Sequence, residues 1–214
     1  DLNRLQAWTY FYMLSFSIIL VAHKQEEVML EALRWLLAAV YAWGGFNKLT
    51  PYFAVDNFPW FCEAFVWTKP LGAFPGLGYA VALVEFLFAA GLIWRWSRPV
   101  FRWVVPGFHL FIALALSPFG LDWNAVVIPW NIAMGAMVWV LFDPGKSASN
   151  SFFSIFKNTK PLVGSALAIP LTLAWVLPVF NIFHCWDEAL SWKMYSNTQT
   201  EANFYSPKPV LEPV

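Results

Sequence analysis

The chain has 214 residues, of which 59% are hydrophobic and only 12% are charged, and its mean hydropathy is +0.55. A soluble domain usually carries about a quarter of charged residues, so this composition argues against an ordinary water-soluble domain. The formal net charge is zero, and nothing in the composition points to nucleic-acid binding. The two cysteines, Cys62 and Cys185, are too few for a disulfide scaffold or a thiolate metal cluster. We therefore predict an all-α membrane protein.

Six apolar stretches approach the roughly 20 residues that a helix needs to cross a bilayer. They cover residues 8–22, 30–46, 77–94, 100–116, 124–142 and 162–183. The last stretch contains Pro170 and Pro178, which membrane helices tolerate when they pack against neighbours. The sequence thus predicts a bundle of about six transmembrane helices over residues 1–183.

The connections between these stretches differ in character. Residues 47–76 form a long segment rich in proline and aromatic residues, which we interpret as a re-entrant or interfacial outer loop. Residues 184–214 form a short polar tail, which we predict to lie outside the membrane.

The distribution of basic residues predicts the orientation in the membrane. Lys24, the run from Arg95 to Arg102, and the lysines at 146, 157 and 160 would share one face of a six-helix bundle. The positive-inside rule makes that face cytoplasmic. Both termini and residues 47–76 would then be extracytoplasmic, in a multi-pass protein of a bacterial inner membrane or an equivalent bilayer. Cys62 and Cys185 would share the outer side, either as a disulfide or as two unpaired buried thiols.

Three ionisable residues lie in or at the end of apolar stretches, where charge is costly and functional roles are common. Lys48 follows the Gly44–Gly45 step, which permits close backbone approach. It could be a neutral base, or a lysine that anchors the helix at the interface. Glu85 could orient Lys48, pair with His109, or join helices structurally. His109 could shuttle protons, donate to a bound oxygen, or be a satisfied core residue.

Two amides lie beside tryptophan rings on the fifth stretch. Asn124 and Asn131 are seven residues apart, hence on one helix face, and Trp130 precedes the second. We predict that Asn124, Trp130 and Asn131 line a cofactor cavity, or alternatively that the amides join helices by hydrogen bonds. No second histidine lies at ligand spacing from His109, so we expect no metal site.

In this order, these residues resemble the vitamin K-dependent γ-carboxylase family and its bacterial relatives that carry the horizontally transferred transmembrane (HTTM) domain. Tyr41–Leu49 is similar to the helix end that carries the family's catalytic lysine, and Glu85 and Phe108–His109 match polar positions of the following helices. Leu190–Tyr195 resembles the strand that opens the family's lumenal domain, which implies that residues 184–214 are the start of a truncated domain of this type. The resemblance covers residues 35–205 and implies a quinone or quinol cofactor. Small DoxX-type membrane proteins are a more distant likeness.

The resemblance implies a definite reaction. Lys48 would deprotonate a reduced naphthoquinone, with Glu85 and His109 in support. The quinol would react with oxygen to give an epoxide and a strong base, and the base would start carboxylation of a peptidyl glutamate. The family has a histidine before the helix that corresponds to residues 8–22, whereas residues 1–8 here contain none.

Three functions follow from this pattern. The missing histidine and the short tail favour an accessory or scaffold subunit of a larger membrane complex, whose partners would be other membrane subunits and the lipid bilayer. The first alternative is a quinol-dependent carboxylase or epoxidase-like enzyme with Lys48 as base. The second is a DoxX-like, quinone-linked oxidoreductase subunit.

Overall fold

The computed structural model describes residues 6–123, 125–143, 151–157 and 159–194. This part of the chain is all-α and forms eight α-helices. They are α1 (Ala7–Ala22), α2 (Glu26–Asn47), α3 (Phe58–Cys62), α4 (Pro75–Ile93), α5 (Arg98–Leu116), α6 (Val127–Leu141), α7 (Ser154–Lys157) and α8 (Pro161–Trp175). A π-helical turn, η2 (Phe53–Asn57), and two 3₁₀ segments, η3 (Lys69–Ala73) and η4 (Leu177–Phe183), complete the described elements.

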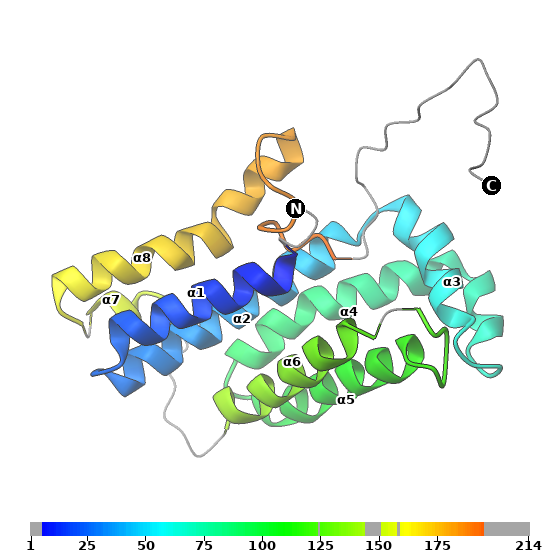
Figure 1. The fold of residues 1–214 in the computed structure, drawn as a ribbon, viewed down its shortest axis with the longest axis horizontal. Helices are drawn as coiled ribbons and strands as arrows, with labels where there is room; N and C mark the ends of the chain where they lie inside the picture. The colour runs from blue at the N-terminus through cyan, green and yellow to red at the C-terminus, as the bar shows by residue number, and fades with distance from the viewer. Residues whose placement is uncertain (1–5, 124, 144–150, 158, 195–214) are drawn as a thin grey trace, which may run out of the picture.

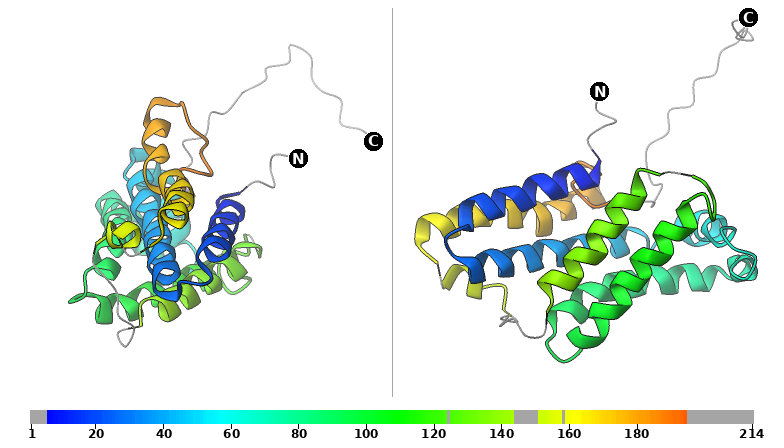
Figure 2. Two further views of the ribbon diagram at one scale, coloured as in Figure 1. Left: turned by 90° about the vertical axis from the view of Figure 1, so that its left-hand side faces the viewer. Right: turned by 60° about the horizontal axis from the view of Figure 1, so that its bottom comes forward.

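The helices form two groups that share one seam. Helices α1, α2 and α8 pack together on one side, and α4, α5 and α6 pack together on the other, as Figures 1 and 2 show. The seam is the extensive contact between α2 and α4. Most of the buried apolar core therefore surrounds α2, whose residues from Leu36 to Tyr41 are almost entirely inaccessible to solvent.

Prolines mark several helix boundaries, as the local chemistry requires. Proline stands in the first turn of α4, α5 and α8, where its missing N–H would have no partner in any case. Pro178 removes the N–H that would bond Ala174 O, and the α-helical part of α8 ends at Trp175. The indole of Trp192 donates to that carbonyl instead, at 3.3 Å. Residues 187–194 thereby pack back onto the bundle.

Three helices of the described chain are long and apolar enough to cross a membrane. They are Pro75–Ile93, Arg98–Leu116 and Pro161–Phe183, the last of which joins α8 and η4. The prediction of six spans is wrong by this measure. Helices α1 and α6 are apolar but short, and α2 carries four charged residues in its first nine. Two of them, Glu31 and Arg34, are buried and paired at 3.1 Å.

The segment predicted as a long outer loop is mostly helical. Between α2 and α4 the chain forms η2, α3 and η3, which fold back against the start of α4 at one end of the bundle (Figure 1). Pro59 and Pro70 stand at the starts of short helices, where a proline does not interrupt the helix. The expected strand at Leu190–Tyr195 is also wrong in its described part, where residues 190–192 form a turn.

Candidate functional site

A buried ion pair joins the end of α2 to the middle of α4. Lys48 Nζ lies 2.7 Å from Glu85 Oε1 and 2.8 Å from Glu85 Oε2, so the ammonium donates to both carboxylate oxygens. The two residues are 7% and 8% exposed. Charges this deep are stable only when they are paired, and here the net charge of the pair is zero. Of the roles open to Glu85, pairing with Lys48 is therefore the one the geometry supports.

The ion pair depends on the close approach of α2 and α4. A Cβ atom on Gly45 would overlap the backbone of Phe86 and would lie 2.8 Å from Ala82 O. A Cβ on Gly44 would lie 3.1 Å from Glu85 Oε1. The two glycines thus let the backbones meet and leave space for the carboxylate beside Lys48, as the sequence predicted.

A second polar group holds His109 of α5 in one orientation. Asn131 of α6 donates through Nδ2 to Val127 O at 2.8 Å, which leaves Asn131 Oδ1 as the acceptor that faces His109 Nδ1 at 2.8 Å. His109 therefore carries its proton on Nδ1 and, when neutral, accepts at Nε2 from the Tyr41 hydroxyl, 2.8 Å away. A main-chain carbonyl of α6 thus fixes the tautomer of His109.

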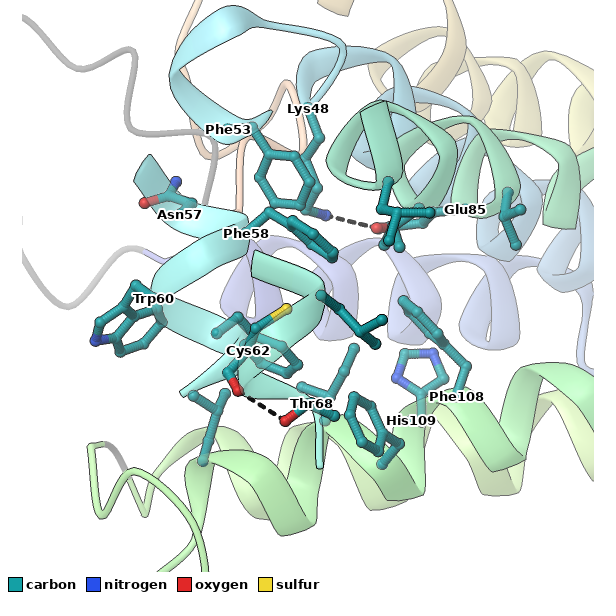
Figure 3. A pocket seen from close by; sticks show the side chains of 18 of the residues that line it. Lys48, Phe53, Asn57, Phe58, Trp60, Cys62, Thr68, Glu85, Phe108 and His109 are labelled. Carbon is teal, nitrogen blue, oxygen red and sulfur yellow. Dashed lines mark hydrogen bonds and ion pairs between the residues drawn. The ribbon is translucent and has the colours of Figure 1, made fainter. Parts of the chain in front are cut away.

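Both polar groups line one apolar cavity of about 500 Å³. Figure 3 shows Lys48 and Glu85 at one side of it, His109 and Phe108 at another, and the rings of Phe53 and Phe58 beside the pair. The walls come from η2, α3, α4, α5 and α6 together with Met194. The aromatic residues of the lining are Phe53, Phe58, Trp60, Phe61, Trp67, Phe108, Phe111 and Trp130. A volume of this size accommodates an aromatic ring system with a short tail.

The two polar groups differ in what they offer to a ligand. Both nitrogens of His109 already have hydrogen-bond partners, so this ring mainly shapes the wall. The ammonium of Lys48 has a third N–H beyond the two given to Glu85, and each carboxylate oxygen has a further lone pair. As a unit the pair can donate one proton or accept one, which fits a ligand with a carbonyl or hydroxyl oxygen.

The sequence singled out most of the residues that meet here. Lys48, Glu85, His109, Trp130 and Asn131 all line the cavity. Asn124 lies outside the described residues, and α6 begins only at Val127.

Sequence reasoning missed Tyr41, which is fully inside the bundle and holds His109. A signal existed, because Tyr41 lies seven residues before Lys48 and hence on the same face of α2.

The cysteines and the acidic residues of the described chain form no disulfide or metal site beside this cavity. Cys62 and Cys185 are both free thiols, Cys62 buried in the cavity wall and Cys185 exposed. Burial raises the pKa of the Cys62 thiol. Among the described residues, no three histidine, cysteine, aspartate or glutamate side chains gather in a way that could hold a metal ion.

No family model, curated protein or solved structure matches the chain. The resemblance to the γ-carboxylase family therefore stays a prediction.

Proposed function

We propose that this protein binds a quinone or quinol in the cavity between α3, α4 and α5, and that the Lys48–Glu85 pair exchanges a proton with an oxygen of its ring. The observation that carries the proposal is a buried ion pair at the wall of a largely apolar cavity that is rich in aromatic side chains. An aromatic ring with polar oxygens matches both parts of that surface.

The membrane setting supports a lipid-soluble ligand. Three helices are long and apolar enough to span a bilayer, and two of them, α4 and α5, supply cavity walls. Their outer faces expose large apolar side chains such as Leu83, Leu87 and Leu110. A ligand dissolved in the bilayer would therefore meet the elements that line the cavity.

The ion pair supports proton exchange more than simple anchoring. When Lys48 is the charged partner, it donates to a quinone carbonyl, and Glu85 accepts the proton of a quinol hydroxyl. This assignment modifies the predicted role of Lys48 as a neutral base, because Lys48 Nζ lies 2.7 Å from Glu85 Oε1 and the two side chains act as a pair. Exclusion of water by the aromatic walls strengthens these interactions.

The proposal covers two of the functions considered above. A DoxX-like oxidoreductase subunit would pass the reduced ring on, whereas a carboxylase-like enzyme would use it with oxygen. Formation of a quinone epoxide by the purified protein, and its loss in the Lys48→Met variant, would select the second. The accessory-subunit reading has support in the many exposed aromatic side chains, such as Trp67, Trp96 and Trp103, which suit partner helices as well as lipid.

The direct test is binding of a naphthoquinone with a short isoprenoid tail to the protein purified in mild detergent. Quinones quench tryptophan fluorescence, and Trp60, Trp67 and Trp130 line the cavity. We expect saturable quenching that weakens about tenfold or more in the Lys48→Met/Glu85→Leu variant, since hydrogen bonds to charged groups are lost. That variant replaces the pair by apolar side chains and so avoids a lone buried charge.

Two controls make the result decisive. Lys193→Met removes a lysine that is paired with Glu188 and does not itself line the cavity, and this variant should bind as the wild type does. Ala80→Trp places a ring at the cavity wall from an exposed position and should prevent binding. Quenching that is unsaturable and equal in all variants would reject the proposal. Co-purification with other subunits in fixed ratio would then favour the scaffold role.

A further inference from the structure

A basic hollow lies at the end of the bundle opposite to α3. Both ribbon figures place the turn between α1 and α2 beside the start of α8 (Figures 1 and 2). A hollow of about 710 Å³ lies between them, and two valines form its apolar part. The polar residues that line it are His23, Lys24, Gln25, Lys157, Thr159 and Lys160.

The three lysines of the hollow have no carboxylate partner in the part of the chain that the structure describes. Within the described ranges, Lys24, Lys157 and Lys160 form no ion pair, whereas Lys48 and Lys193 each have a carboxylate partner. No acidic residue lines the hollow. Like charges held around one concave surface repel one another, so an anion bound between them would relieve that repulsion.

Of the remaining polar groups, Gln25 supplies a donor. Thr159 Oγ1 donates to Gln25 Oε1 at 2.8 Å, which ties the two rims together and leaves the Gln25 amide nitrogen as a donor. His23 Nδ1 lies 2.8 Å from Leu20 O, a group that can only accept, so the neutral ring gives its N–H to that carbonyl and has no further donor for an anion. Helices α2 and α8 both begin here without a side-chain cap. Glu26 and Glu27 stand in the first turn of α2 and offset its dipole, whereas the first turn of α8 has no acidic residue, so the positive end of the α8 dipole adds to the field.

The surroundings distinguish a lipid from a free ion. The hollow opens at the ends of apolar helices, where phospholipid headgroups lie, and Val21 and Val163 form part of its wall. Next to it, Leu20 of α1 and Leu162 of α8 are 75% and 83% exposed. A phosphate in the hollow could therefore have acyl chains against these leucines. Basic pockets of this kind favour anionic headgroups.

We infer that this hollow is a binding site for the phosphate headgroup of an anionic phospholipid, held by Lys24, Lys157 and Lys160. It shares no residue with the quinone cavity and does not depend on that ligand. The lipid would join the α1–α2 turn to the start of α8, two segments that are far apart in sequence.

The test is lipid binding to the purified full chain by native mass spectrometry and by the midpoint of thermal unfolding. The probes are phosphatidylglycerol, phosphatidylcholine and inorganic phosphate at equal concentration. We expect one phosphatidylglycerol to remain bound and to raise the midpoint, with phosphatidylcholine and phosphate much weaker. The Lys157→Gln/Lys160→Gln variant should bind phosphatidylglycerol about tenfold or more weakly.

A matched control removes the same charge elsewhere. Lys69→Gln/Arg95→Gln also loses two positive charges from exposed positions, one at each end of the bundle, and should keep the lipid. Equal losses in both variants would show a diffuse charge effect and overturn the site. Equal binding of phosphatidylcholine would overturn headgroup selectivity, and an equal shift by inorganic phosphate would replace the lipid by a free anion. Absence of any retained lipid or shift in the wild type would also reject the proposal.

Discussion

The two ends of the bundle hold their lysines in opposite ways. At the α3 end, Lys48 is 7% exposed and donates to both oxygens of one carboxylate. At the other end, three lysines surround an open hollow and none has an acidic partner within the described chain. A buried cation has to be neutralised by the protein itself, whereas an exposed cation is stabilised by water and can bind an external anion. The environment therefore determines the role of the same side chain.

The largest effect should come from separating the buried pair. We expect Lys48→Met to destabilise the protein by about 3–5 kcal/mol, because Glu85 is left as a lone buried charge. Lys48→Met/Glu85→Leu should recover most of that loss. Thermal and denaturant unfolding in detergent measure both. The matched change Lys157→Met in the hollow should stay within about 0.5 kcal/mol of the wild type. Equal losses of stability in the Lys48→Met and Lys157→Met variants would show that the two ends of the bundle do not differ in this way.

The next effect concerns the seam that brings Lys48 to Glu85. Gly45→Ala should cost about 3 kcal/mol, since the new methyl group meets the backbone of α4, which cannot move aside. Gly107→Ala is the control, because a Cβ there has nothing within 4 Å. It should be neutral or stabilising by up to about 1 kcal/mol through helix propensity. Thermal unfolding compares the two, and a neutral Gly45→Ala would mean that α2 and α4 are less tightly packed.

A smaller effect should follow from removing the residue that orients His109. Asn131→Leu leaves the Nδ1 proton of His109 buried without an acceptor, and we expect a loss of about 1–3 kcal/mol. Tyr41→Phe removes the hydroxyl that donates to His109 Nε2 and should lower the free energy of unfolding by about 1 kcal/mol. If the tautomer is set as described, the double variant should differ from the sum of the single ones. Strict additivity would show that the three side chains do not act as one network.

The smallest effect is a difference in thiol reactivity. Cys185 is exposed and should react rapidly with a maleimide at neutral pH, whereas burial raises the pKa of Cys62 and leaves little of its reactive thiolate. Labelling of Cys62 in a Cys185→Ser variant should therefore rise as the pH increases toward that pKa. A bound quinone should slow it, since Cys62 lines the cavity. Fast labelling of Cys62 that no ligand changes would place this thiol outside the binding site.

The sequence was most informative where charge stands in apolar surroundings. Lys48, Glu85 and His109 are conspicuous because ionisable groups are costly in such segments, and all three line one cavity. Tyr41 was not predicted as a site residue, because an aromatic residue in an apolar helix usually belongs to the hydrophobic core. Helix phase alone could not show that α6 brings Asn131 to His109, since the order of helices in a bundle is not encoded in any one helix.

Helix existence was easier to predict than helix length or membrane crossing. The apolar stretches coincide with α1, α2, α4, α5, α6 and α8, but the bounds differ enough to leave three candidate spans. Helix α2 begins four residues before the predicted stretch, at Glu26, and Glu31 and Arg34 neutralise each other inside it. Residues 53–73 were predicted as an outer loop, whereas they form short helices in which Pro59 and Pro70 stand at the starts.

The contacts of residues 187–194 have a consequence for the order of folding during synthesis. Asn47 Nδ2 donates to Ser191 O across 144 residues of sequence, and the Trp192 ring lies 6.3 Å from that of Phe11. Helix α1 therefore cannot complete its packing until nearly the whole described chain has left the ribosome. Until then the early helices would expose surfaces that the last segment later covers, and lipid or a chaperone must shield them. Pausing translation after α8 should thus yield a protease-sensitive intermediate.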